Sequence, residues 1–271
     1  MRTISTRLRA RGRTIAFVPT MGALHAGHLS LVDRARKHAD AVVVSIFVNP
    51  TQFGPTEDFS RYPRDFRGDL KKLRGAGVDV LFAPDAQAMY PSGFATTVHV
   101  AGVTETLCGP FRPGHFDGVA IVVLKLFEIV APHFAVFGLK DFQQTVVIRR
   151  MVRDLALPVR IVTTPTLREA DGLALSSRNA RLSASERSAA PVIYRALSAA
   201  RRCFAEGEHS AAMIKKIVRT ILRREPLLRV EYVSLVDPDS LHELRRAARG
   251  AVIAVAGRIG GVRLIDNVVL G

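Results

Sequence analysis

Between about residue 14 and residue 162, the chain repeats one pattern: a short apolar run rich in β-branched residues, then a segment with helical spacing. The run AVVVSIFV at 41–48 is apolar on both faces, as expected of a strand that is covered on both sides of a sheet. Strands that alternate with helices favour right-handed βαβ units and a parallel sheet. The pattern therefore predicts a doubly wound, Rossmann-like α/β domain that binds its ligand at the carboxyl ends of the strands.

The limits of these elements follow from the same pattern. We expect strands at 15–18, 41–48, 78–82, 134–137 and 159–163, and helices at 29–39, 64–74, 115–130 and 142–154.

The pattern changes after Thr164. Residues 167–179 have no clean period and indicate an ordered loop, and Ser183 with Glu186 forms a capping box for a helix that is expected to bend at Pro191. A helix at 210–224, strands at 230–236 and 251–256, and a final hairpin turning at Gly260-Gly261 complete the chain. We therefore expect two domains, 1–165 and 166–271, the second a smaller α+β domain.

Composition excludes several classes of protein. The chain has 39 Lys and Arg against 24 Asp and Glu, a net charge of +15, but the excess is spread along it. The basic pairs at 201–202, 215–216, 223–224 and 245–246 have no interleaved aromatics, which favours solvated helix faces over a nucleic-acid partner.

Location can also be inferred from composition. Two cysteines in 271 residues favour a reducing compartment, the cytoplasm. The most apolar stretch, 119–131, is short and carries Lys125 and Glu128, so no membrane span is expected. The arginine-rich N-terminus resembles a transit peptide only superficially, because strand signal already begins at Thr14.

The strongest functional signal is the segment from Phe17 to Leu29, where a strand end, a glycine-containing turn and the start of a helix follow each other. The free N–H groups of a first helical turn, together with the helix dipole, form a seat for phosphate. His25 and His28 project from one side of that seat, and Gly27 allows close approach. Imidazole can stabilise the negative charge that builds on a leaving phosphate.

The histidine pair is also compatible with two different roles. It could be half of a metal site, or it could be two solvated residues at a helix start. A zinc site would need further ligands at the usual spacing, and Cys108 and Cys203 stand far apart and alone. The strand, turn and helix context favours the phosphate site.

Polar side chains follow other predicted strands. Asn49 and Gln52 follow the second strand, and their neutral amides suit hydroxyl and carboxylate groups. Lys140 follows the strand at 134–137 and can neutralise phosphate oxygens. Gln143 and Gln144 come next, and at least one of them is expected only to open a helix, because adjacent helical residues face different ways. Ser176, Ser177 and Arg178 form a further set suited to anions.

Five segments together resemble the pantoate–β-alanine ligase family, within the wider HxGH nucleotidyltransferase-like superfamily. They are residues 18–28, 45–53, 112–116, 140–144 and 171–179, and the resemblance covers nearly the whole chain. It implies ATP-dependent condensation of pantoate with β-alanine to pantothenate, in coenzyme A biosynthesis. In the first step the pantoate carboxylate attacks the α-phosphorus of ATP and pyrophosphate leaves. In the second step the amine of β-alanine attacks the pantoyl adenylate and releases AMP.

The resemblance also implies roles for individual residues. The expected catalytic residues are His28, as proton donor to the departing phosphate, with His25, Lys140 and Arg178. The expected pantoate-binding residues are Gln52, which also touches β-alanine, and Gln144. The expected ATP-binding residues are Met21, Gly22, Ala23, Leu24, His25, Ala26, Gly27, His28, Gly138, Leu139, Lys140, Asp141, Leu167, Leu175, Ser176, Ser177 and Arg178.

The chain departs from the family pattern at two positions. Leu139 stands where a glutamate is common, and Gly68 where the first of two acids is common, so that only Asp69 remains. Magnesium is expected with ATP, and Asp69 is either a ligand or a plain surface carboxylate. The resemblance further implies a homodimer and closure of the second domain over the adenylate.

A second enzyme class would require a different substrate pocket. An HxGH nucleotidyltransferase that adenylylates a phosphate ester would need cationic groups where Gln52 and Gln144 stand, because its substrate carries more charge. The neutral glutamines favour a hydroxy acid.

Overall fold

The computed structural model describes residues 1–55 and 57–271, which form two compact units. The first consists of Met1–Ala101, Arg112–Leu139 and Val147–Thr166. The second consists of Gly102–Phe111, Lys140–Val146 and Leu167–Gly271. The second unit therefore includes two short segments that the sequence pattern placed in the first domain.

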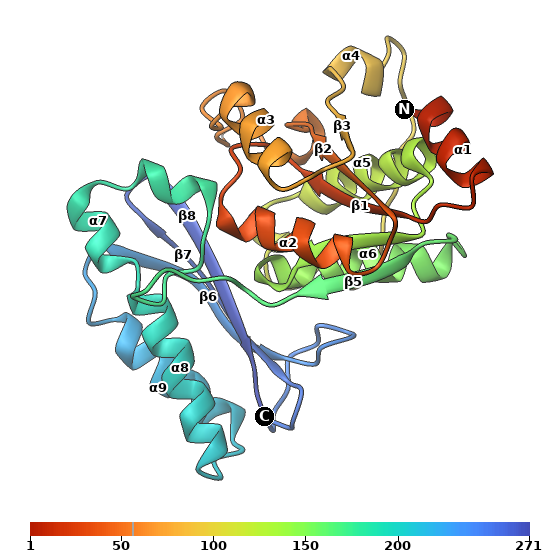
Figure 1. Cartoon of the computed structure of the whole chain (residues 1–271). Helices are drawn as coiled ribbons and strands as arrows, with labels where there is room; N and C mark the ends of the chain where they lie inside the picture. The colour runs from red at the N-terminus through yellow and green to blue at the C-terminus, as the bar shows by residue number, and fades with distance from the viewer. Residues whose placement is uncertain (56) are drawn as a thin grey trace. The chain divides into compact units, whose positions relative to one another are not determined.

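The first unit is built on a five-stranded sheet, which confirms the predicted doubly wound parallel fold (Figure 1). Every neighbouring pair of strands is parallel, and the order is β3-β2-β1-β4-β5. The strands are β1 (Ile15–Thr20), β2 (Ala41–Ile46), β3 (Val80–Phe82), β4 (Phe134–Gly138) and β5 (Arg160–Thr164). The order reverses beside β1, so the carboxyl ends of β1 and β4 flank the point where such sheets bind ligands.

Helices cover both faces of this sheet. The α-helices that precede β5 in the chain are α1 (Arg2–Ala10), α2 (Ala26–Arg36), α3 (Phe66–Gly75), α4 (Ala86–Met89), α5 (His115–Val130) and α6 (Phe142–Asp154). Right-handed crossovers place α2 and α5 on opposite faces, as Figure 1 shows. Phe127 of α5 packs edge-on against Phe17 and Phe137, with ring centroids 6.4 Å apart in both pairs. The limits of α5 and α6 are those predicted, whereas α1 and α4 were not predicted.

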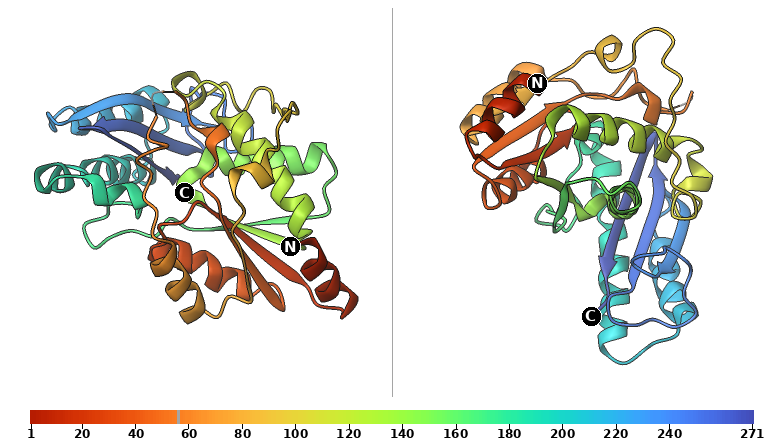
Figure 2. Two further views of the ribbon diagram at one scale, coloured as in Figure 1. Left: turned by 90° about the horizontal axis from the view of Figure 1, so that it is seen from above. Right: turned by 90° about the vertical axis from the view of Figure 1, so that its right-hand side faces the viewer.

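The second unit is an antiparallel sheet with helices along one face (Figure 2). Its strands, in the order β6-β7-β8, are β6 (Leu228–Val236), β7 (Val252–Ile259) and β8 (Val262–Val269). Its helices are α7 (Ala184–Ala189), α8 (Val192–Ala205) and α9 (Ala211–Leu222). The predicted hairpin at Gly260-Gly261 joins β7 to β8, and a bulge interrupts β6 between Val230 and Tyr232.

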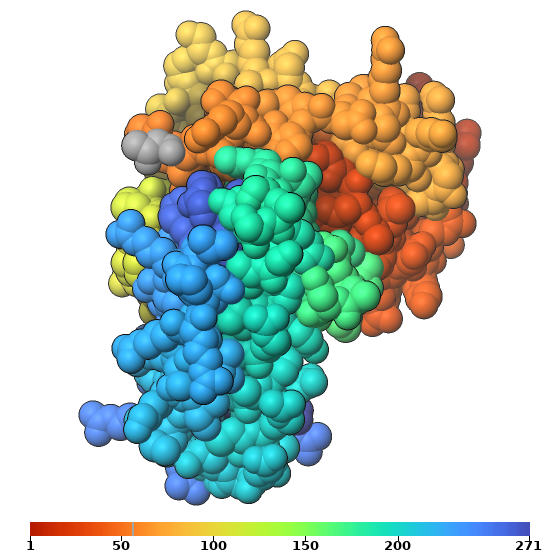
Figure 3. All heavy atoms as spheres, turned by 90° about the vertical axis from the view of Figure 1, so that its left-hand side faces the viewer, coloured from red at the N-terminus to blue at the C-terminus, as the bar shows by residue number. Residues whose placement is uncertain are grey.

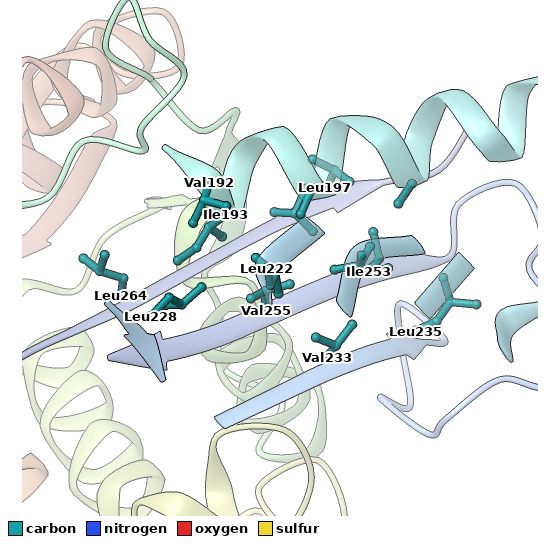
Figure 4. Close-up of a cluster of buried hydrophobic side chains, with 14 of the residues drawn as sticks. Val192, Ile193, Leu197, Leu222, Leu228, Val233, Leu235, Ile253, Val255 and Leu264 are labelled. Carbon is teal, nitrogen blue, oxygen red and sulfur yellow. The ribbon is translucent and has the colours of Figure 1, made fainter. Parts of the chain in front are cut away.

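The core of this unit lies between the helices and the sheet. Side chains of α8, including Leu197, and of α9, including Leu222, meet Val233 and Ile253 of the strands, and all four are buried (Figure 4). The two helices also pack side by side, as the space-filling view shows (Figure 3).

The helical segment that begins at Ser183 differs from the prediction in one detail. The capping box is confirmed, because Ser183 Oγ accepts the Glu186 N–H and Glu186 Oε2 accepts the Ser183 N–H at 2.8 Å. Pro191, however, separates two helices instead of bending one, and it occupies the N-cap of α8. Its missing N–H and fixed φ suit a helix start better than a helix interior.

The exposure of the side chains can be compared with the predictions made from composition. The paired basic residues predicted to be solvated are exposed, apart from half-buried Lys215, which pairs with Glu243 at 2.7 Å. Within residues 1–55 and 57–271, no helix is both long and apolar enough to cross a membrane. Cys108 and Cys203 are free thiols.

The packing of α8 can be tested by truncation. Leu197 is fully buried, so Leu197→Ala should lower the free energy of unfolding by about 2–5 kcal/mol through lost burial and the cavity left behind. Leu227 is 45% exposed, and Leu227→Ala should change stability by about 0.5 kcal/mol or less. Urea unfolding followed by circular dichroism compares the two variants, and equal losses would contradict this assignment of the core.

Candidate active site

The turn that leaves β1 is held against the neighbouring strand. Thr20 Oγ1 donates to the carbonyl of Ser45 at 2.7 Å and accepts the N–H of Gly22 at 3.3 Å. Gly22 has φ +82°, and a Cβ there would lie 3.0 Å from the Ile46 side chain and 3.1 Å from Asp69 Oδ2. A glycine is therefore needed at this position for both its backbone angle and its surroundings.

Asp69 of α3 fixes the next part of the turn. Its Oδ2 accepts the N–H of Ala23 and its Oδ1 accepts the N–H of Leu24, both at 2.7 Å. Ala23 has φ +50°, a left-handed conformation that a residue with a side chain rarely adopts. Lys72 lies 3.7 Å from Asp69 Oδ1 and donates to the Leu24 carbonyl at 2.7 Å. These charge-assisted hydrogen bonds stabilise a strained turn.

The surroundings of Asp69 show whether its carboxylate fits a magnesium ligand. Only 1% of Asp69 is exposed, so the interpretation as a surface carboxylate is wrong. Both of its oxygens already accept short hydrogen bonds, and in the part of the chain that the structure describes no three His, Cys, Asp or Glu residues gather into a metal site. Asp69 therefore does not fit a magnesium ligand and instead positions the turn.

Gly68, where the family commonly has an acid, lies against the N-terminal cap of α3. Asp65 caps α3 by accepting the N–H of Gly68 at 3.0 Å, and a Cβ on residue 68 would lie 1.9 Å from Asp65 Oδ2. An acid at position 68 is thus incompatible with this cap unless Asp65 moves.

His25 and His28 cap the start of α2. His25 Nδ1 accepts the N–H of Gly27 at 3.1 Å, and His28 Nδ1 accepts the N–H of His25 at 3.3 Å. The ring centroids are 4.1 Å apart. The arrangement is a capping box in which imidazoles replace the usual hydroxyl and carboxylate groups.

These bonds assign the tautomer of both rings. A ring nitrogen that accepts an amide N–H must carry a lone pair, so the proton of each neutral ring is on Nε2. Both residues can therefore donate through Nε2 while Nδ1 holds the backbone.

The main chain here differs from the expectation of free N–H groups at the helix start. The Gly27 N–H bonds to His25, and the His28 N–H bonds to the His25 carbonyl at 2.9 Å. The imidazole Nε2 atoms, together with the helix dipole, are therefore the candidate donors for an anion at this helix start.

Gln52 belongs to η1 (Pro50–Gln52), which follows β2, and its orientation is set by Asn49. Asn49 is 1% exposed, and its Oδ1 accepts from Thr51 and from the Tyr90 hydroxyl at 2.8 Å. Its Nδ2 therefore donates to Gln52 Oε1 at 3.2 Å, which turns Gln52 Nε2 to the sulfur of Met21 at 2.9 Å. The structure thus brings Gln52 beside the first predicted ATP segment. Two residues of the second predicted ATP segment, Gly138 and Leu139, lie at the end of β4 and belong to the first unit, as Gln52 does.

The adjacent glutamines of α6 differ in their roles. Gln143 is buried, and its amide bonds Cys108 N at 2.9 Å, Val103 O at 3.0 Å and Thr106 O at 2.8 Å. Gln143 is therefore structural, as expected for one of the pair, whereas Gln144 is partly exposed.

The second unit contains the other predicted ATP-binding residues. Lys140 lies 3.4 Å from Asp141 Oδ1, and its carbonyl accepts from Asn267 of β8 at 3.0 Å. Asn267 was not identified from sequence, because 127 residues separate it from Lys140.

The loop after β5 is ordered by backbone pairing. Leu175 N donates to Leu167 O at 3.0 Å, and a bridge joins Arg168 to Ala174. Arg168 also forms a bidentate pair with buried Asp266, at 2.5 and 2.9 Å. Ser176 then caps η4 (Ser177–Arg181) by accepting the Arg178 N–H at 3.3 Å. Leu167, Leu175, Ser176, Ser177 and Arg178 are thereby gathered on one short segment.

The parallel sheet and the capped histidines at the start of α2 are together typical of α/β enzymes that bind nucleotides. The model of the family described as pantoate-β-alanine ligase matches residues 1–269. The chain belongs to this family and is an enzyme, a pantoate–β-alanine ligase.

Relatives match over nearly the whole chain. The pantothenate synthetase of Chloroflexus aurantiacus is 56% identical over 96% of this chain and 92% of its own length. That of Herpetosiphon aurantiacus is 54% identical over 97% and 95%.

Solved structures agree in fold. Pantothenate synthetase from Thermus thermophilus has a TM-score of 0.93 at 52% identity, covering 97% of this chain and 96% of its own. The ligase from Francisella tularensis, complexed with β-γ ATP and β-alanine, has a TM-score of 0.79 at 34% identity, covering 98% and 94%.

The role of Asp69 in the turn predicts the effect of neutralising it. In Asp69→Asn, an amide N–H₂ replaces one acceptor and faces a backbone N–H, which should destabilise the protein by about 1–3 kcal/mol. Hydrogen exchange at Ala23 and Leu24 should also become faster. Asp33→Asn makes the same chemical change on an exposed face of α2 and serves as the control. Unchanged exchange at both amides in Asp69→Asn would rule out this role.

Proposed function

We propose that this protein makes pantothenate from pantoate and β-alanine through a pantoyl adenylate, with ATP as the second substrate of the first step. A carboxylate is a poor acylating agent until its oxygen becomes part of a good leaving group, and the adenylate provides one. The arrangement that carries the proposal is the pair of capped imidazoles at the start of α2, together with the amide of Gln52, which contacts Met21 in the turn that leads to them. The Francisella ligase complexed with β-γ ATP and β-alanine supports the assignment of substrates.

In the first step, the pantoate carboxylate attacks the α-phosphorus and the bond to pyrophosphate breaks. Negative charge then builds on the departing phosphates. A neutral His28 with its proton on Nε2 can stabilise that charge by donating a hydrogen bond. Full transfer of a proton would instead need an imidazolium, whose Nδ1–H would oppose the His25 N–H. We therefore assign His28 the role of hydrogen-bond donor, supported by His25.

The remaining residues bind and orient the substrates. Gln52 and Gln144 offer neutral amides that suit the hydroxyl and carboxylate groups of pantoate. Lys140 and Arg178 supply positive charge for the phosphates, Ser176 and Ser177 supply hydroxyls, and the segments 21–28 and 138–141 with Leu167 and Leu175 complete the ATP site.

In the second step, the amine of β-alanine attacks the acyl carbon of the adenylate. The bond from this carbon to the phosphate oxygen breaks, AMP leaves, and the amine loses a proton as the amide forms. Magnesium is proposed to accompany ATP, with phosphate oxygens and water supplying its ligands, since Asp69 is occupied by the turn. A cytoplasmic homodimer that feeds coenzyme A synthesis belongs to the same proposal.

The reaction is tested by incubating the protein with ATP, magnesium, pantoate and β-alanine and measuring AMP. AMP formation that requires both pantoate and β-alanine supports the proposal. AMP that forms without either of them contradicts it.

The role of His28 can be separated from its role as a cap. His28→Ala should slow adenylate formation by roughly 10²-fold or more while the circular dichroism spectrum stays unchanged. An asparagine side chain can keep an acceptor at the Nδ1 position but is too short to place its N–H₂ near Nε2, whereas the longer glutamine can place an N–H₂ there. His28→Gln should therefore retain more activity than His28→Asn, and the reverse order would contradict the Nε2 donor.

The assignment of Gln144 predicts selective loss of one substrate. Gln144→Ala should weaken pantoate binding several-fold and leave ATP binding nearly unchanged, because the amide bonds only the organic acid. Calorimetric titrations of both ligands provide the comparison, with Gln87→Ala, at an exposed position of α4, as the control. Equal losses for pantoate and ATP would refute the assignment.

A further inference from the structure

The main-chain carbonyl of Gln52 is held by the segment that starts α5. His115 Nδ1 lies 2.8 Å from this oxygen, and Arg112 Nη2 lies 3.3 Å from it. The carbonyl ends a three-residue 3₁₀ turn, which forms few internal hydrogen bonds of its own. The position of Gln52 therefore depends on these two donors.

Arg112 is in turn fixed by Glu57. Its Nε and Nη2 donate to the two carboxylate oxygens of Glu57, both at 2.6 Å, in a bidentate pair. The two side chains are 13% and 18% exposed, so water screens the pair weakly. Burial acts to raise the pKa of Glu57, but the hydrogen bonds and charge of Arg112 outweigh it and lower that pKa below its usual value. The carboxylate therefore stays ionised at neutral pH.

The same guanidinium assigns the tautomer of His115. Arg112 Nη1 lies 2.8 Å from His115 Nε2, and a guanidinium can only donate. Nε2 must therefore accept, which places the ring proton on Nδ1, where it is donated to Gln52 O. This is the tautomer opposite to that of His25 and His28.

Close packing leaves the turn little freedom against α5. A Cβ on Gly118 would lie 2.2 Å from Thr51 O and 2.7 Å from the Cα of Gln52. The Gly118 carbonyl also accepts from Asn49 Nδ2 at 3.0 Å. The first turn of α5 thus supports both the main chain of Gln52 and the residue that orients its amide.

We propose that Glu57, Arg112 and His115 are positioning residues that fix the main chain of Gln52 so that its amide meets pantoate. The inference rests on the proposed function, in which Gln52 binds pantoate. None of the three needs to touch a substrate. They influence the reaction only through the position of the Gln52 amide. Substituting them should therefore weaken pantoate binding more than nucleotide binding.

The test removes the donor from His115 and then restores it. His115→Ala should weaken pantoate binding about tenfold, measured calorimetrically with a non-hydrolysable ATP analogue present, while the affinity for the analogue alone stays unchanged. An asparagine can place an N–H₂ near the Nδ1 position, and a glutamine places its amide farther out. His115→Asn should therefore recover most of the affinity, and His115→Gln should not.

A histidine-to-alanine control and a second variant of the network complete the test. His242→Ala makes the same change at an exposed histidine of the second unit, and its pantoate affinity should match wild type. Glu57→Gln keeps size but loses the charge that holds Arg112, and it should weaken pantoate binding several-fold. If His115→Ala does not fold, Glu57→Gln decides in the same titrations.

The outcomes separate this inference from the proposed function. Wild-type protein that makes no pantothenate overturns the proposed function. Active wild type with unchanged pantoate affinity in the folded variants overturns the positioning role alone. Parallel losses of pantoate affinity, analogue affinity and melting temperature, without recovery in His115→Asn, indicate a merely structural role and also overturn it.

Discussion

A buried carboxylate holds the turn on which the site is built. Asp69 takes the N–H groups of Ala23 and Leu24, which keeps a residue with a side chain in the left-handed conformation just before the capped helix. The turn delivers His25 to the N-cap of α2, and the cap fixes the proton of both imidazoles on Nε2. Burying a charge is unfavourable unless hydrogen bonds satisfy it, so the carboxylate and the turn depend on each other. One buried carboxylate thus fixes the turn that positions both imidazoles.

Periodicity predicted most of the fold because the relevant patterns are local. The limits of α5 and α6 and the box formed by Ser183 and Glu186 follow from residues a few positions apart. The helix α1 was missed because the surrounding arginines obscured its single buried position, Ser5. The break at Pro191 was predicted only as a bend, since a proline is compatible with either a kink or a helix start.

The contacts of the site are less predictable than its residues. The histidine pair and Gln52 were identified from motifs, but the capping bonds that take up the N–H groups were not. Arg112 reaches Glu57 across 55 residues and Gln52 across 60, and Asn267 reaches Lys140 across 127. No spacing rule connects such residues, because only the folded sheet and helices place them side by side. The burial of Asp69 is of the same kind, since a lone acid on a helix gives no sign of the loop that will cover it.

The bulge in β6 affects how readily the second unit can associate with other chains at high concentration. A long edge strand offers unpaired N–H and C=O groups on which a second chain can form a cross-chain sheet. In the three-stranded sheet β6 is an edge strand whose end is already paired, because the Leu244 N–H donates to Leu235 O and Val236 bridges to Glu243. Its bulge between Val230 and Tyr232 interrupts the regular spacing of the remaining groups. Glu231, at the bulge, bonds Arg258 and Arg263. A regular neighbour cannot stay in register along this edge, which makes it a poor template for aggregation.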